Sequence, residues 1–150
     1  HMMTFGPVPS RRLGRSLGIN NIPYKNCSYS CVYCQVGRTR NFQVERQEYY
    51  EPQQVFEEVK EACDKADASG ESIDYLTFVP DGEPTLDKNL HATIELIKPL
   101  GKKIALITNS SLLWDDTVRS TLLETDWVSF KIDSAIEEIW RKVNRPHKAV

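Results

Sequence analysis

Short apolar runs alternate with amphipathic helical stretches along most of this 150-residue chain. The apolar runs lie at 16–20, 73–79, 104–108 and 127–132. After each of them, apolar residues recur at helical spacing, and the first such stretch begins at Pro52 and stops at Gly70. Strands that alternate with helices form a parallel sheet covered by helices, with right-handed crossovers. The sequence therefore predicts one α/β domain over residues 1–150, built from four (βα) repeats.

Each apolar run ends in a polar segment, and in chain order these segments are NNIPYKNC, PDGEPT, TNSS and KIDS. In parallel α/β folds, ligands bind at the carboxyl ends of the strands, which meet at one edge of the sheet. We therefore expect a single site at this edge. It would combine three cysteines with Glu83, Asn109, Ser110, Lys131 and Asp133.

The segment CSYSCVYC sets Cys27, Cys31 and Cys34 at spacings of four and three, with no fourth cysteine nearby. Three thiolates at this spacing can converge on one small metal centre, and four interpretations remain open. A zinc site lacks a fourth ligand, because neither His91 nor His147 stands beside the segment. A redox pair of Cys31 and Cys34 leaves Cys27 without a role.

The other two interpretations are iron–sulfur clusters. A cluster that only carries electrons needs four thiolates, and Cys63 is the one spare cysteine. Cys63 lies on the apolar face of the first helical stretch, where a free cysteine usually packs in the core. The last interpretation is a [4Fe–4S] cluster with one open iron, which binds a small molecule through amine and carboxylate groups.

Charge is distributed unevenly along the chain. Residues 1–50 carry seven Arg and Lys against two Glu, and residues 51–150 carry twelve Arg and Lys against nineteen Asp and Glu. The basic part brackets the cysteines, which suits either an anionic ligand or a solvated surface. Clustered cysteines of this kind indicate a cytoplasmic protein, and no apolar run reaches the ~18 residues of a membrane span. His1 and Met2 resemble an expression scar.

Together these motifs resemble the radical S-adenosylmethionine (radical SAM) superfamily. Its hallmark is CxxxCxxC with an aromatic residue beside the last cysteine, which here is Tyr33. Gly82 and Glu83 are similar to its Gly–Glu motif, and residues 108–110 to its polar segment after the third strand. The runs FGPVPSRRLGRSLGINNIP and CSYSCVYCQVGRT resemble one subgroup, the Fe–S oxidoreductases grouped with tRNA wyosine-base synthases.

The resemblance implies that Cys27, Cys31 and Cys34 hold a [4Fe–4S] cluster whose open iron binds S-adenosylmethionine (SAM). It implies SAM contacts from Tyr33, Gly82, Glu83, Thr108, Asn109, Ser110, Lys131 and Asp133. The reduced cluster would split SAM into methionine and a 5′-deoxyadenosyl radical, which abstracts hydrogen from the substrate. The electron would come from a donor such as flavodoxin or ferredoxin. The substrate is open, and the subgroup points to tRNA modification.

The superfamily's common core is a partial TIM barrel of six (βα) units, whereas about four are present here. We therefore expect the N-terminal part of such a barrel, truncated before the later strands. A four-stranded parallel sheet would leave an open edge and an exposed inner face. Pairing with another chain through the open edge is the consequence that we expect.

Overall fold

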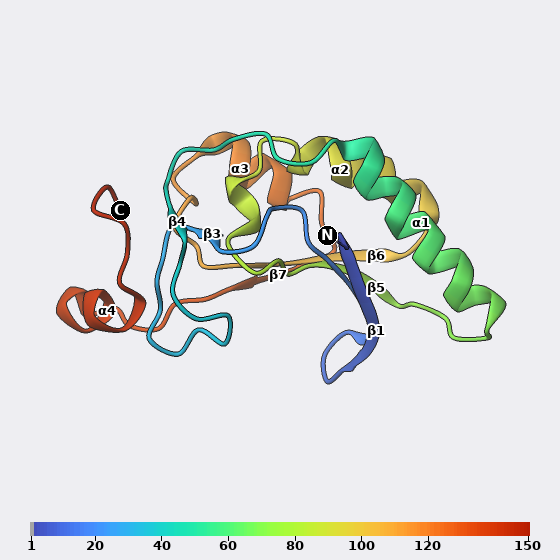
Figure 1. Ribbon diagram of the computed structural model, residues 1–150, viewed down its shortest axis with the longest axis horizontal. Helices are drawn as coiled ribbons and strands as arrows, with labels where there is room; N and C mark the ends of the chain where they lie inside the picture. Colours follow the sequence, from blue (N-terminus) through green and yellow to red (C-terminus); the bar gives the residue numbers. More distant parts are fainter. Residues whose placement is uncertain (1) are drawn as a thin grey trace.

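The computed structural model describes residues 2–150 and contains a five-stranded sheet with helices on one face (Figure 1). The sheet order is β1-β2-β5-β6-β7. These strands are β1 (Thr4–Ser10), β2 (Gly14–Ile19), β5 (Tyr75–Phe78), β6 (Lys103–Thr108) and β7 (Trp127–Phe130). The last four run parallel, and β1 runs antiparallel to β2. The predicted α/β class and its four parallel strands are confirmed.

Strand β1 is not expected from the sequence, because Gly6, Pro7 and Pro9 interrupt the alternating pattern of a strand. An edge strand tolerates proline, since the backbone on its outer side needs no partner. The register of β1 against β2 shifts between Phe5 and Val8, where the prolines and glycine lie. This irregular strand forms one edge of the sheet.

Three helices form what we call the helix layer: α1 (Pro52–Ala68), α2 (Leu90–Ile97) and α3 (Asp116–Leu122). The 3₁₀ turns η1 (Pro84–Leu86) and η2 (Lys98–Leu100) flank α2. Alternate strand residues point to this layer because side chains on a strand alternate between its two faces. Those residues are Leu17 and Ile19 on β2, Leu76 and Phe78 on β5, and Ile104 and Leu106 on β6, all of them buried. The main core therefore lies between the sheet and the helix layer.

The opposite face of the sheet carries smaller side chains. Ser16 Oγ lies 2.6 Å from Thr77 Oγ1, and both residues are buried. The ring of Phe5 covers Gly18, where an added Cβ would lie 2.1 Å from Phe5 Cζ. Glycine is required there by the close approach of the ring. The expectation of an exposed inner face is therefore wrong for Ser16 and Thr77. Strand β1, which pairs with β2, and the hydrogen bond between the two small side chains keep this part of the face from solvent.

The other edge of the sheet is β7. Within residues 2–150, β7 pairs with β6 alone, so its outer edge is open as expected. Phe130, at the end of the strand, is 48% exposed, and Ile132 just beyond it is 74% exposed. An open strand edge of this kind is a template for further pairing.

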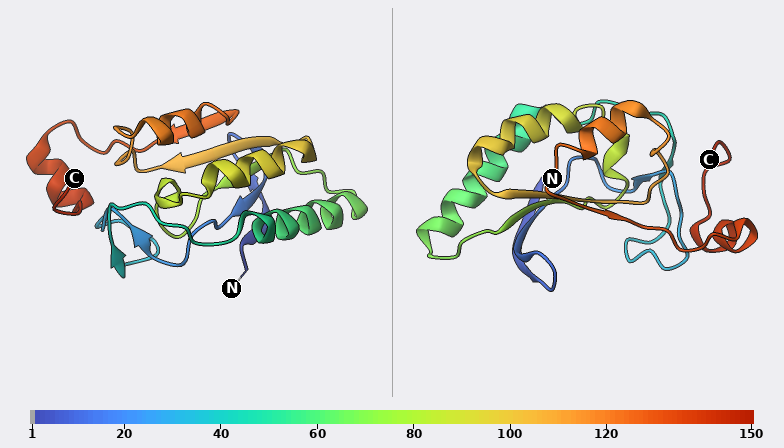
Figure 2. Two further views of the ribbon diagram at one scale, coloured as in Figure 1. Left: turned by 90° about the horizontal axis from the view of Figure 1, so that it is seen from above. Right: turned by 180° about the vertical axis from the view of Figure 1, so that it is seen from behind.

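The last helix, α4 (Glu137–Asn144), lies beyond the carboxyl ends of the strands and outside the helix layer (Figures 1 and 2). Of its apolar residues, Ile139 is exposed, whereas the ring of Trp140 meets the ring of Tyr29 edge to face at 5.9 Å. The helix forms where the sequence predicts it. It covers the cysteine loop (residues 27–34) instead of the sheet.

Two short strands flank the cysteine loop, β3 (Asn26–Cys27) and β4 (Asn41–Phe42), which pair in parallel. The β1–β2 turn with Arg11 and Arg12 lies at the opposite, amino end of the strands (Figure 1). These two basic residues are therefore remote from the cysteine loop. In the part of the chain that is described, no helix is both long and apolar enough to cross a bilayer.

Candidate cofactor site

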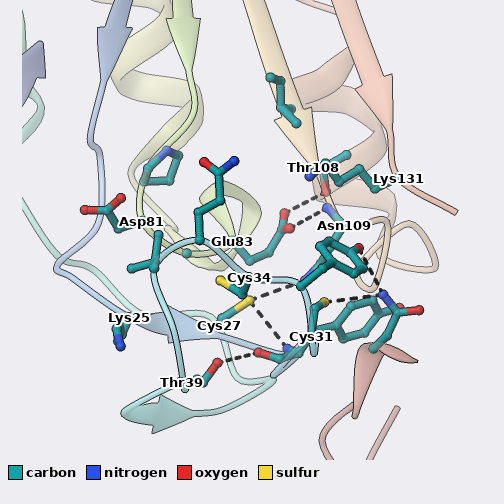
Figure 3. A pocket seen from close by; sticks show the side chains of 18 of the residues that line it. Lys25, Cys27, Cys31, Cys34, Thr39, Asp81, Glu83, Thr108, Asn109 and Lys131 are labelled. Atoms are coloured by element: carbon teal, nitrogen blue, oxygen red, sulfur yellow. Dashed lines mark hydrogen bonds between the residues drawn. The ribbon is translucent and has the colours of Figure 1, made fainter. Parts of the chain in front are cut away.

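A cavity of about 420 Å³ opens at the carboxyl ends of the strands, against the cysteine loop. Ten of the eleven predicted site residues line it: Cys27, Cys31, Tyr33, Cys34, Gly82, Glu83, Thr108, Asn109, Lys131 and Asp133. Figure 3 shows the three cysteines on one side of this cavity, with Glu83 and Thr108 across from them. Residues far apart in the sequence thus line one cavity, as expected for the ends of parallel strands.

The three cysteines are free thiols. Cys27 Sγ accepts hydrogen bonds from the backbone N–H of Tyr29 at 3.5 Å and from Asn109 Nδ2 at 3.6 Å. Burial raises the pKa of the Cys27 thiol to about 12. A metal centre would reverse this, because a coordinating thiol is deprotonated outright.

Cys31 and Cys34 are linked by a tight turn, in which Cys34 N donates to Cys31 O at 3.2 Å. Cys31 Sγ also accepts a hydrogen bond from Asn144 Nδ2 at 3.3 Å. Cys34 is the most exposed of the three. All three cysteines line one cavity, with Cys34 exposed and with Cys27 and Cys31 partly buried.

Gly82 joins the loop after β5 to the cysteine loop. A Cβ at this position would lie 2.0 Å from the backbone oxygen of Asn26. Glu83 N donates to the same oxygen at 3.1 Å, and Lys25 N donates to Asp81 O at 2.9 Å. The backbone at Gly82 thus approaches Asn26 closely, and these contacts join the loop after β5 to the segment that leads into the cysteine loop.

The Glu83 carboxylate is 1% exposed and well supplied with donors. Its Oε1 accepts from the hydroxyls of Thr85 and Thr108, each at 2.6 Å. Its Oε2 accepts from Asn109 N at 2.6 Å. Burial raises the pKa of Glu83, and these hydrogen bonds oppose that rise because they favour the charged form. The carboxylate is thereby fixed against the end of β6.

The wall next to β7 is formed by a polar cluster. Tyr33 OH donates to Asp133, and Asn144 Nδ2 donates to Asp133 Oδ2 at 2.5 Å. These hydrogen bonds lower the pKa of Asp133, since they favour its charged form. Lys131 Nζ lies 5.8 Å from the centre of the Tyr33 ring, so it stacks on the ring instead of pairing with Asp133.

Ser110 is the predicted residue that does not line the cavity. Its backbone is left-handed, with φ of 70°, and its hydroxyl donates to Lys131 O at 3.3 Å. It ties the end of β6 to the end of β7. Residues that sequence reasoning missed include Lys25 and Asn144, which both line the cavity. Asn144 carried no sequence signal, because it stands inside an ordinary helical pattern, 113 residues from Cys31.

The competing metal interpretations find no support. Cys63 is a residue of α1 that packs in the main core and does not line the cavity, so it cannot be a fourth ligand there. Among residues 2–150, no group of three or more His, Cys, Asp or Glu side chains is placed to hold a single metal ion. A cluster is larger than one ion: three free thiols can each ligate one of its irons, and the amides of Asn109 and Asn144 donate hydrogen bonds to two of those sulfurs. The residues therefore fit a cluster better than zinc.

A family model described as the radical SAM superfamily matches residues 21–149. The chain is 59% identical over 146 residues to UPF0026 protein MJ1312 of Methanocaldococcus jannaschii, covering 97% of this chain and 45% of that protein. It is 31% identical over 138 residues to an S-adenosylmethionine-dependent nucleotide dehydratase of Lacinutrix mariniflava, covering 87% of this chain and 28% of that protein.

Among solved structures, TYW1 with a lysine-pyruvate adduct bound matches with a TM-score of 0.66 at 17% identity, over 89% of this chain and 47% of that chain. The chain thus spans about half or less of the length of these relatives. These likenesses show that the chain shares its fold with TYW1. The chain belongs to the radical SAM superfamily, whose cofactors are a [4Fe–4S] cluster and SAM.

Proposed function

We propose that this chain is the cofactor-binding part of a radical SAM enzyme, in which Cys27, Cys31 and Cys34 ligate the [4Fe–4S] cluster. One observation carries the proposal: the three free thiols of CxxxCxxC line the same cavity as the predicted SAM contacts at three strand ends. When bound, the two cofactors supply the one-electron cleavage of SAM that starts hydrogen abstraction from a substrate.

Glu83 is the residue that we propose to receive the SAM ammonium group. Its Oε2 accepts one hydrogen bond, from Asn109 N, and a carboxylate oxygen has capacity for a second donor. The two threonine hydroxyls on Oε1 hold the carboxylate in place. Because the group is buried, an ammonium partner would stabilise its charge strongly.

The β6 and β7 ends supply the remaining contacts that we propose. Asn109 and Lys131 face the cavity from neighbouring strands and offer an amide and an ammonium to the SAM carboxylate and ribose. Tyr33 contributes an aromatic face beside the thiols, and Asp133 orients its hydroxyl. Gly82, through its close backbone approach, and Ser110, through its hydroxyl bond to Lys131 O, hold the loops that carry these side chains.

The substrate and the electron donor belong to the complete enzyme. We propose a cytoplasmic donor such as flavodoxin or ferredoxin, because the exposed Cys34 side of the loop is open to a redox partner. For the substrate we propose a nucleotide or a tRNA base, which suits both the nucleotide dehydratase and the TYW1 fold.

The test is anaerobic reconstitution followed by SAM cleavage, with this chain and with a version spanning the full length of its relatives. We expect about four irons and matching sulfide per chain. With dithionite and SAM, the longer protein should release methionine and 5′-deoxyadenosine, measured by chromatography. A longer protein that holds a full cluster and leaves SAM intact would contradict the proposal.

Glu83→Gln tests the SAM contact in the reconstituted protein. Loss of a charge-assisted hydrogen bond of ~1.5–3 kcal/mol should weaken SAM binding at least about tenfold in equilibrium dialysis. Asp81→Asn is the matched control, because Asp81 is an exposed acid on the same loop and the same cavity. Equal weakening in both variants would remove Glu83 from the proposed contact.

A further inference from the structure

We propose that Asn144 is a positioning residue for the cluster ligand Cys31, and that its amide donation to the sulfur raises the cluster's reduction potential. The proposal rests on the proposed function, since it assumes a cluster on these cysteines. It adds the contacts of a residue on the last helix, Asn144, which the proposed function does not use. It assigns a role to α4, whose covering of the cysteine loop the sequence does not predict.

The side chain of Asn144 bridges three groups of the cavity wall. Its Nδ2 lies 3.3 Å from Cys31 Sγ and 2.5 Å from Asp133 Oδ2. The same nitrogen lies 3.4 Å from the hydroxyl of Tyr33. The amide nitrogen must face these three groups, because the alternative amide orientation would set the amide oxygen against the Asp133 carboxylate. The donor to Cys31 is therefore defined by its neighbours.

Burial makes this amide unusual on its helix. Asn144 is 2% exposed and is the one buried residue of α4, although the helix contains Ile139 and Trp140. A buried polar side chain persists where its hydrogen bonds repay its removal from water. Its Oδ1 is also buried and has no partner among the described residues. Apolar packing of α4 therefore does not explain why its last residue, an asparagine, is the buried one.

The backbone holds Asn144 against the cysteine loop on both sides. Ser30 N donates to Asn144 O at 3.0 Å, and Val32 N donates to Val143 O at 2.9 Å. On the far side, His147 N donates to Ser28 O at 2.8 Å. The cysteine loop is thus paired along its length with residues 143–147, and this pairing sets the amide opposite Cys31.

A hydrogen bond to a ligating sulfur draws electron density from it and favours the reduced, more negative cluster. Asn109 donates to Cys27 in the same way, but at the longer distance of 3.6 Å. The bond from Asn144 is the shorter of the two, at 3.3 Å. We therefore expect Asn144 to have the larger effect on the potential.

The experiment compares Asn144→Ala with wild type and with Trp140→Leu after anaerobic reconstitution. Trp140→Leu loosens the packing of α4 on Tyr29 but keeps the amide beside Cys31. Iron content is measured first, and the potential is then followed by an EPR-monitored redox titration. Wild type without a cluster would refute the proposed function itself, before any variant is compared.

For Asn144→Ala we expect full iron and about a tenfold lower ratio of reduced to oxidised cluster at a fixed potential, a shift of ~59 mV. Trp140→Leu should keep the wild-type ratio. Loss of iron from Asn144→Ala alone, at an unchanged melting temperature, would equally support positioning. If the alanine variant unfolds, Asn144→Leu keeps the volume and removes the donors. A wild-type potential in the donor-free variant, or the same shift in Trp140→Leu, would overturn the assignment.

Discussion

Different interactions stabilise the helix layer and the cysteine loop. In the helix layer, fully buried apolar side chains such as Leu17, Phe78 and Ile94 pack between strands and helices. Around the cysteine loop, the contacts are backbone hydrogen bonds, amide donors and edge-to-face aromatic pairs such as Tyr29 with Trp140. Apolar packing stabilises the fold without specifying single atoms, whereas the loop depends on individual polar partners. Substitutions in the two regions should therefore change different properties.

The largest contrast concerns the cysteines themselves. Cys31→Ala should reduce cluster iron from about four per chain to near zero after anaerobic reconstitution, because three thiolates are the minimum for this site. Cys63→Ala should keep the iron, since Cys63 packs in the main core. Iron and sulfide assays measure both. Iron loss in the Cys63 variant would support a cluster with four thiolate ligands and would contradict the assignment of Cys63 to the core alone.

The next contrast concerns global stability. Phe78→Ala should lower the free energy of unfolding by about 3–5 kcal/mol, because Phe78 is 0% exposed in the main core. Ile139→Ala on α4 should change it by no more than about 0.5 kcal/mol, because Ile139 is 46% exposed. Urea unfolding followed by circular dichroism gives both values. Similar losses would mean that α4 belongs to the cooperative core.

Gly82 tests the junction between the two regions. Gly82→Ala should cost about 3 kcal/mol, because its Cβ would meet the Asn26 oxygen at 2.0 Å and no flexible group can yield. The same substitution at Gly70 should cost about 1 kcal/mol, since only its positive φ of 75° opposes it and no atom lies within 4 Å. If Gly82→Ala has the milder effect in urea unfolding, the loops are not joined as described.

The smallest effect concerns Asp87, a polar group beside the helix layer. Burial raises its pKa from 3.8 to about 6. A raised folded-state pKa favours the protonated form, so this contribution to stability is present below pH 3.8 and is lost as the pH rises through 6. Relative to Asp87→Asn, wild type should therefore lose stability between pH 4 and 7.5, by less than about 3 kcal/mol. The free energy of unfolding of each protein is measured across this pH range. If the difference between the two proteins stays constant, the raised pKa of Asp87 is refuted.

The elements that rest on local patterns could be predicted from the sequence. Pro52 and Gly70 bracket α1, and the apolar run at 104–108 lies within β6. Because parallel strands share one end, the convergence of Glu83, Thr108 and Asn109 on one cavity also follows from the strand pattern. These features need no knowledge of long-range contacts.

What escaped prediction depends on contacts between distant segments. The register of β1 is set by its pairing with β2 and by the ring of Phe5 over Gly18, which no periodicity reveals. The helical pattern of α4 predicts a helix but not its partner, because Trp140 would suit the sheet as well as the cysteine loop. Asn144 matters through its three neighbours, and nothing in its own surroundings along the chain identifies them.

The pairing of the cysteine loop with residues 143–147 also orders events during biosynthesis. Asn144 follows Cys31 by 113 residues, so at ~5–20 residues per second the ribosome needs roughly 6–23 seconds to make the residues that cover the loop. During that interval Cys31 lacks the amide of Asn144, and the loop backbone at Ser28 and Val32 lacks its partners His147 and Val143. Under the proposed function, iron and sulfide enter the completed loop only once residues 143–147 have been made, and the thiols need protection from oxygen until then.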